Sequence, residues 1–232
     1  MSPADRVAAL FAETYGTQPT GVWSSPGRVN LIGEHTDYTG GFVMPLAIEE
    51  RAYLAARPRS DRRIRAVASG RGLEEVDLDD VGPGRPKGWL AYLSGSAWVA
   101  EANAPDGARP GHGWDLALLS DVPVGAGLSS SAAITCATLL AMDELGGWQR
   151  PLAELARWGQ QVENVVVGMP CGIMDGFACA NGVEGGALML DCRSLRATPA
   201  ALPDGASFLL VNSMVRHRLV GGEYRQRRED CE

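Results

Sequence analysis

A strand, a glycine-rich loop and a helix follow one another between Trp114 and Leu145, and this succession constrains the fold most. Residues Trp114 to Leu119 alternate between polar and apolar side chains, which is typical of a β-strand. The loop DVPVGAGLSSSAA comes next, and the run from Ala132 to Leu145 is rich in Ala and Leu, as helices are. Glycines let backbone N–H groups approach a ligand, and a helix N-terminus attracts anions, so the loop is a candidate phosphate site.

The loop alone leaves two interpretations open. No GK[ST] sequence follows the glycines, so the loop is not a Walker A motif. A glycine turn in which Ser129, Ser130 or Ser131 caps the helix explains the sequence as well as a nucleotide-binding loop does. In a nucleotide site, a serine hydroxyl could complete the coordination shell of a magnesium ion.

Elements on both sides of this unit predict an α+β fold with mixed strands and helices. The first 15 residues place Val7, Leu10, Phe11 and Tyr15 at helical spacing, which indicates an amphipathic helix that packs on the rest of the chain. Further helices are expected at 89–101, from Pro151 to about Gly168 and at 173–180, with strands within 22–43 and at 52–56, 63–67, 187–191 and 207–212. The charged end GGEYRQRREDCE has a helical composition.

Composition excludes several classes of function. The 232 residues include 21 Lys and Arg against 28 Asp and Glu, a net charge of −7, without a sustained basic run. Nucleic acid and membranes are therefore not expected partners, and no apolar stretch approaches the roughly 20 residues that span a bilayer. Five cysteines without CxxC spacing or a signal peptide argue against a disulfide framework. We expect a cytoplasmic protein with small-molecule partners.

Polar residues are dense in the segment PGRVNLIGEHTDYTGG. It carries Arg28, Glu34, His35 and Asp37 between apolar strand segments and glycine turns. Carboxylates and an imidazole in fixed positions can hydrogen-bond the adjacent hydroxyls of a polyol, although a solvated hairpin tip is the other interpretation. A zinc site at His35 is not favoured, because the other histidines are remote in sequence and no HxxxH pair exists.

Two later segments carry further candidates. The segment GMPCGIMDG places Asp175 in a glycine-bounded turn, 12 residues beyond Glu163. A carboxylate held there beside an arginine would stay ionised and could orient or deprotonate a hydroxyl, although many such aspartates are helix N-caps. The segment NSMVRHRLVGGEY adds Arg216, His217 and Tyr224 near a predicted strand end, where they could equally be surface residues.

Taken together, PGRVNLIGEHTDY, PVGAGLSSSAA, GMPCGIMD and NSMVRH...GEY resemble, in this order, the galactokinase branch of the GHMP small-molecule kinases. The resemblance runs from Gly21 to the last residue. It implies an N-terminal helix at 1–20, then a GHMP-kinase N-terminal domain at 21–206, in which a mixed sheet packs with helices in a two-layer fold like that of a ribosomal protein. Residues 207–232 would begin a truncated C-terminal region, with the family's second, ferredoxin-like domain missing.

The resemblance implies a reaction and a set of site residues. The family transfers the γ-phosphoryl group of ATP to the anomeric hydroxyl of galactose with Mg²⁺, so galactose and ATP are the expected partners of a protein that is monomeric at full length. The matching positions are Asp175 and Arg28 for catalysis; Glu34, His35, Asp37, Gly172, Asp175 and Tyr224 for the sugar; Trp89, with Tyr92 near the adenine, and Gly125, Ala126, Gly127, Leu128, Ser129, Ser130 and Ser131 for ATP; and Ser130 and Glu163 for the metal.

Two departures from the family pattern bear on turnover. Gly176 stands where the family usually has Gln, so a side-chain hydrogen-bonding group is lost beside Asp175 and a weaker or misplaced carboxylate is predicted. The missing domain normally closes the cleft, which makes an inactive truncated fragment one alternative. Another is a sensor that binds galactose and ATP without turnover, although the intact GLSSSAA favours catalysis. N-acetylgalactosamine is an alternative substrate.

Overall fold

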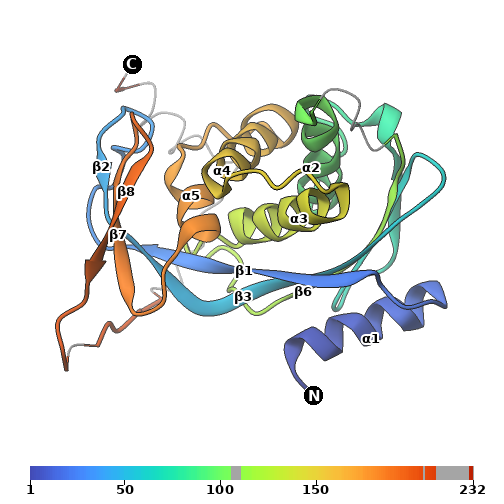
Figure 1. The fold of residues 1–232 in the computed structure, drawn as a ribbon, viewed down its shortest axis with the longest axis horizontal. Coiled ribbons are helices and arrows are strands. Elements are labelled where there is room, and N and C mark those ends of the chain that lie inside the picture. Colours follow the sequence, from blue (N-terminus) through green and yellow to red (C-terminus); the bar gives the residue numbers. More distant parts are fainter. Residues whose placement is uncertain (106–110, 206, 213–229, 232) are drawn as a thin grey trace.

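A mixed β-sheet forms the centre of the computed structural model, which describes residues 1–105, 111–205, 207–212 and 230–231 (Figure 1). Eight strands hydrogen-bond in the order β2-β7-β3-β6-β4-β5, with β1 also paired to β3 and β8 to β7. The pair β4 and β6 is parallel and the other pairs are antiparallel. The strands are β1 (Gly21–Asn30), β2 (Phe42–Val43), β3 (Pro45–Pro58), β4 (Arg63–Ala68), β5 (Glu74–Asp77), β6 (Trp114–Ser120), β7 (Gly186–Asp191) and β8 (Arg196–Ala201).

Helices cover both faces of the sheet (Figure 1). Helix α1 packs alone on one face, and α2, α3, α4 and α5 lie together over the other. The helices are α1 (Pro3–Tyr15), α2 (Leu90–Asn103), α3 (Ser130–Gly146), α4 (Leu152–Gln161) and α5 (Met174–Asn181), with a 3-10 turn η1 (Leu78–Asp80) and a π-helix η2 (Val162–Val167) that continues α4. The predicted α+β fold is confirmed, and α1 adds cover on the second face of the two-layer arrangement.

Helix α3 is the central helix, and its packing fixes the glycine-serine loop. It contacts β1 and β3 beneath it and α2, α4 and α5 around it. A helix that is surrounded in this way needs apolar residues on all of its faces. The loop in front of α3 rests on β1: a Cβ at Gly27 would lie 2.7 Å from the Leu128 carbonyl oxygen, to which the Arg28 N–H donates at 3.2 Å. A larger residue at Gly27 would push the loop away from β1.

The strand predicted at Trp114–Leu119 is confirmed as β6, but both of its faces are buried. Helix α1 covers one face, and the core beneath α2 and α3 covers the other. Asp115 is therefore buried as well, and it is tolerated because Arg59 donates to it at 2.8 Å and Arg65 at 2.7 Å.

The strand predicted at 207–212 is wrong, because these residues have no regular secondary structure. Phe208, Leu209, Leu210 and Val211 are exposed, and the described part of the chain provides no strand that pairs with them. Apolar residues alone do not make a strand when the backbone N–H and C=O groups lack a neighbouring strand. The helix predicted for the charged end lies mostly outside the described residues.

Strand β8 was not predicted, because Pro199 and the polar residues around it hide its strand character. It pairs with β7 at the edge of the sheet, where a proline is tolerated because its missing N–H is not needed by a second neighbour. None of the described helices is both long and apolar enough to cross a membrane.

Helix α1 is held on the sheet by apolar burial, as its spacing predicted. Phe11 is 0% exposed and packs in a cluster with Val7 and Leu119. Because Phe11→Ala leaves a cavity there, we expect the free energy of unfolding to fall by about 3–5 kcal/mol in urea denaturation. The exposed Glu13→Ala is the control, with an expected change below about 0.5 kcal/mol. Equal stability of both variants would contradict the docking of α1.

Candidate active site

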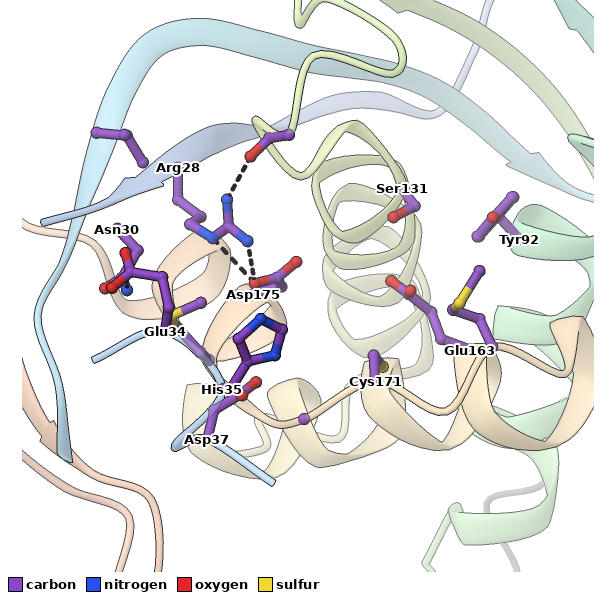
Figure 2. Close-up of a pocket in the computed structure, with 15 residues that line it drawn as sticks. Arg28, Asn30, Glu34, His35, Asp37, Tyr92, Ser131, Glu163, Cys171 and Asp175 are labelled. Carbon is purple, nitrogen blue, oxygen red and sulfur yellow. Dashed lines mark hydrogen bonds and ion pairs between the residues drawn. The ribbon is translucent and has the colours of Figure 1, made fainter. Parts of the chain in front are cut away.

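A cavity of about 360 Å³ brings together segments that are far apart in the sequence. The end of β1 and the turn after it form one side, the glycine-serine loop and α3 form another, and η2 with the start of α5 completes it (Figure 2). Its lining residues are Arg28, Val29, Asn30, Glu34, His35, Asp37, Tyr92, Gly127, Ser131, Glu163, Met169, Cys171, Gly172, Met174 and Asp175.

The ion pair between Arg28 and Asp175 lies at the centre of this site. Arg28 donates through Nε, at 2.9 Å, and through Nη2 to one carboxylate oxygen of Asp175, as Figure 2 shows. The side chains are 12% and 29% exposed, so solvent screens the pair only in part. Two contacts from a planar guanidinium fix the direction of the carboxylate as well as its distance.

The glycine-serine loop is bound to the same ion pair. Ser129 donates from Oγ to the second carboxylate oxygen of Asp175 at 2.7 Å, and Arg28 Nη1 donates to the Gly127 carbonyl at 2.7 Å. Ser129 precedes α3 in the left-handed conformation, with φ 58°, and makes no capping hydrogen bond to the helix. The interpretation of this serine as a plain side-chain N-cap is therefore wrong, because its hydroxyl is used by Asp175.

The turn after β1 carries the polar residues expected to bind a sugar. Glu34 and His35 are exposed at the cavity, and Glu34 accepts a hydrogen bond from the Asn30 amide at 3.0 Å. Asp37 is less exposed and contacts the backbone of Gly172, where a Cβ would overlap its carboxylate. Burial, together with repulsion from Asp175, raises the pKa of Asp37, although the Met174 N–H partly offsets this shift.

A buried carboxylate, Glu163, faces the loop from η2. Burial raises its pKa to about 7, with repulsion from Asp175 as the second cause, and hydrogen bonds from Ser131 and Cys171 act in the opposite direction. A carboxylate and a hydroxyl next to an open cavity fit Mg²⁺, which binds a few protein oxygens and completes its shell with water and phosphate. Among the described residues there is no group of three or more His, Cys, Asp or Glu side chains that could hold a metal by itself.

Most of the predicted site residues in the described part of the chain line the cavity, and the others do not. Arg28, Glu34, His35, Asp37 and Asp175 line the cavity. So do Gly127, Ser131, Glu163 and Gly172, whereas Gly125, Ala126, Leu128, Ser129, Ser130 and Trp89 are not among its lining residues. Arg216, His217 and Tyr224 lie outside the described residues. The roles assigned to all these residues stay predictions.

Two of the placements refine what the sequence suggested. The loop serine that faces Glu163 is Ser131, whereas the metal was assigned to Ser130. The aromatic residue that lines the cavity from α2 is Tyr92, whereas Trp89 precedes the helix and donates its indole N–H to Glu74. Trp89 is the N-cap residue in front of α2, whereas Tyr92 lies in the first turn of the helix and reaches the cavity.

Sequence reasoning missed Asn30 and Cys171. Both belong to segments that were singled out for their carboxylate, guanidinium and imidazole side chains, and an amide or a thiol gave no comparable signal there. Asn30 supports Glu34, and its buried Oδ1 has no hydrogen-bond partner among the described residues. Cys171 lines the cavity between Glu163 and Asp37, and burial, together with repulsion from Glu163, Asp175 and Asp37, raises the pKa of its thiol.

Gly176 lies inside α5 and does not face the cavity. A Cβ there would lie 3.1 Å from the Ala156 carbonyl oxygen of α4, so the glycine permits close packing of α4 against α5. Asp175 next to it makes three hydrogen bonds, two from Arg28 and one from Ser129. These contacts hold the carboxylate without a side chain at residue 176. The predicted weakening of catalysis by Gly176 stays a prediction.

Two protein-family models match the chain. The model described as the galactokinase galactose-binding signature matches residues 9–58, and the GHMP kinases N terminal domain matches residues 91–183. The first covers β1 and the turn with Glu34, His35 and Asp37. The second covers the glycine-serine loop, Glu163 and Asp175. The two halves of the cavity therefore fall in the two matched regions.

Similar proteins agree with these matches. A galactokinase of Streptomyces coelicolor is 45% identical over 99% of the chain, and one of Chloroflexus aggregans is 43% identical over 97%. The chain spans 59% and 57% of the lengths of these relatives. A Lactococcus lactis galactokinase complexed with galactose has a TM-score of 0.78 and 32% identity, over 87% of this chain and 52% of that one.

A mevalonate kinase of Methanococcus jannaschii, 20% identical with a TM-score of 0.63 over 78% of this chain and 55% of that one, shares the fold. The motifs, the cavity that they form, the family models and the relatives lead to one assignment. The chain belongs to the galactokinase branch of the GHMP kinases.

Proposed function

We propose that the protein transfers the γ-phosphoryl group of ATP to the anomeric hydroxyl of galactose, giving galactose 1-phosphate and ADP. The observation that carries this proposal is the position of Asp175. Its carboxylate is bound to Arg28 on the sugar-signature strand and to Ser129 in the glycine-serine loop. A carboxylate between a polyol site and a phosphate loop lies where the acceptor hydroxyl and the phosphoryl group must meet.

On the sugar side, Glu34, His35 and Asp37 present two carboxylates and an imidazole to the cavity. We assign them, with Gly172 and Tyr224, to the hydroxyls of galactose. The galactose complex of the Lactococcus lactis relative, which has the same fold, supports this choice of ligand. N-acetylgalactosamine is a second candidate substrate.

On the phosphate side, the loop from Gly125 to Ser131 leads into the N-terminus of α3, whose free N–H groups favour an anion. Ser131 and Glu163 would hold Mg²⁺, with Ser130 beside them in the loop. Bound there, Mg²⁺ would neutralise charge on the phosphate oxygens. We assign Trp89 and Tyr92 to the vicinity of the adenine.

Asp175 and Arg28 would act on the reacting groups themselves. Phosphoryl transfer mainly requires positioning and charge stabilisation, because the transition state is loose and the hydroxyl proton can leave late. Asp175 therefore orients the attacking hydroxyl and can accept its proton. Arg28 fixes Asp175 and adds positive charge close to the phosphoryl oxygens. We expect this chemistry in the cytoplasm, where ATP is available.

A sensor that binds galactose and ATP without turnover is the second candidate function. The hydrogen bond from Ser129 to Asp175 favours catalysis, because it fixes the orientation of the carboxylate relative to the glycine-serine loop. If the protein is a sensor, it should bind galactose and ATP without forming ADP.

We expect Asp175→Asn to lower kcat roughly 10²–10⁴-fold, because the amide cannot accept a proton and carries no charge to form an ion pair with Arg28. ATP consumption with galactose is measured for this chain and for a version extended to the length of its relatives. Asp121→Asn is the matched control, since Asp121 is an exposed carboxylate at the start of the glycine-serine loop and does not line the cavity. Turnover unaffected by Asp175→Asn would contradict the assigned role, and absence of turnover with retained binding would favour the sensor.

Glu163 gives the metal-free protein a pH-dependent stability. Its pKa of about 7 in the folded state is above the value of 4.5 for a free side chain, so the unfolded chain releases this proton first. The stability of the fold should fall as the pH rises from about 4.5 to 7, by about 3 kcal/mol from this group, and stay level above that.

Glu163→Gln removes this loss of stability. Without Mg²⁺, the variant should match the wild type near pH 4.5 and become more stable than it at pH 8, as measured by urea denaturation. The exposed Glu184→Gln is the control and should show no such trend. A difference between Glu163→Gln and wild type that does not change with pH would show that Glu163 is not desolvated in this way.

A further inference from the structure

The wall on one side of the candidate sugar pocket is thin. A second hollow, of about 310 Å³, lies next to the pocket, and Asp37 and Cys171 line both of them. The strip of chain at Cys171 and Gly172 therefore has open space on two sides. Packing against neighbouring side chains cannot hold such a strip as it holds a core segment, so hydrogen bonds must contribute more of the restraint.

Two amide side chains supply these hydrogen bonds. Asn164, in η2, accepts at Oδ1 from the Cys171 backbone N–H at 2.8 Å, and the same N–H also donates to the Met169 carbonyl at 2.8 Å. Gln160, in the last turn of α4, donates from Nε2 to the Cys171 carbonyl at 3.3 Å. The backbone N–H and the backbone carbonyl of Cys171 are therefore both hydrogen-bonded by side chains of one helical segment, α4 and its continuation η2.

The strip at Cys171 in turn positions Asp37. The backbone of Gly172 lies so close to the Asp37 carboxylate that a Cβ would overlap it. The backbone of Met174, two residues further on, lowers the pKa of Asp37 and so acts on the same carboxylate. A shift of the strip would therefore displace the carboxylate that we assign to the sugar hydroxyls.

We propose that Gln160 and Asn164 are positioning residues for sugar recognition, which hold the Cys171–Gly172 strip and through it Asp37. This inference rests on the proposed function, since it takes galactose as the ligand of the pocket. Neither side chain is among the lining residues of the sugar pocket itself. Their effect should appear in the affinity for galactose and not in the affinity for ATP.

Asn164 accepts through its amide oxygen and Gln160 donates through its amide nitrogen, and this difference can be tested. A backbone N–H can only donate, so Asn164 must accept through its oxygen; a backbone carbonyl can only accept, so Gln160 must donate through its nitrogen. Replacing an amide by a carboxylate keeps the acceptor and removes the donor. The same chemical change should therefore be tolerated at residue 164 and harmful at residue 160.

The experiment measures galactose binding by titration calorimetry at pH 8, with neither nucleotide nor Mg²⁺ present. We expect Asn164→Ala and Gln160→Glu each to weaken binding about three- to tenfold, the usual effect of one lost hydrogen bond, and Asn164→Asp to bind like wild type. Gln161→Glu is the matched control: it adds the same charge one residue further, where the side chain accepts from Asn103. Mg-ATP affinity should be unchanged in Gln160→Glu and Asn164→Ala.

The outcomes separate this inference from the proposed function. Galactose binding by the wild type with equal affinity in every variant would overturn the positioning role alone. Equal weakening by Asn164→Asp, Gln160→Glu and Gln161→Glu would also overturn it, because added charge would then be the cause. A wild-type chain that does not bind galactose would overturn the proposed function together with this inference.

Discussion

The ion pair between Arg28 and Asp175 joins the parts of the molecule that the sequence keeps apart. Arg28 belongs to β1, Asp175 to the first turn of α5, and the loop before α3 is bound to both through Gly127 and Ser129. A guanidinium has donors on several sides of one plane, so a single side chain can hold a carboxylate and a carbonyl at once. The sugar-signature turn and the candidate phosphate loop therefore keep one relative position.

The same site concentrates negative charge. Asp37, Glu163 and Asp175 surround one cavity, and Arg28 is the one guanidinium that lines it in the described part of the chain. Burial, with repulsion from Asp175 as the second cause, raises the pKa of both Asp37 and Glu163. A magnesium ion would relieve this repulsion. Burying Glu163 lowers the stability of the fold, and a cation bound there, as we propose, would restore it.

Much of the fold and of the site could be predicted from the sequence. The strand-loop-helix unit has a strong local signal, and the charged residues at Arg28, Glu34 and Asp175 stand in dense motifs. The strand at 207–212 was wrongly predicted because strand formation depends on a partner elsewhere in the chain. Strand β8, with Pro199, was missed for the complementary reason, since pairing with β7 makes it a strand despite its composition.

Within the site, the sequence could not say which side chains turn toward the cavity. Ser130 and Ser131 are equivalent in sequence, and the start of α3 decides that Ser131 faces Glu163. Asn30, Gln160 and Asn164 act through hydrogen bonds to other protein groups. Such contacts depend on tertiary geometry, and uncharged amides give no pattern by which to find them.

The central claim is that Asp175 lies where the sugar and the transferred phosphoryl group meet. A crystal structure of the protein with galactose and a non-hydrolysable ATP analogue tests this most directly. The account predicts that the anomeric hydroxyl lies within hydrogen-bond distance of the Asp175 carboxylate, with the terminal phosphate of the analogue at the loop from Gly125 to Ser131. Galactose bound with its anomeric carbon pointing away from Asp175, or outside this cavity, would contradict it.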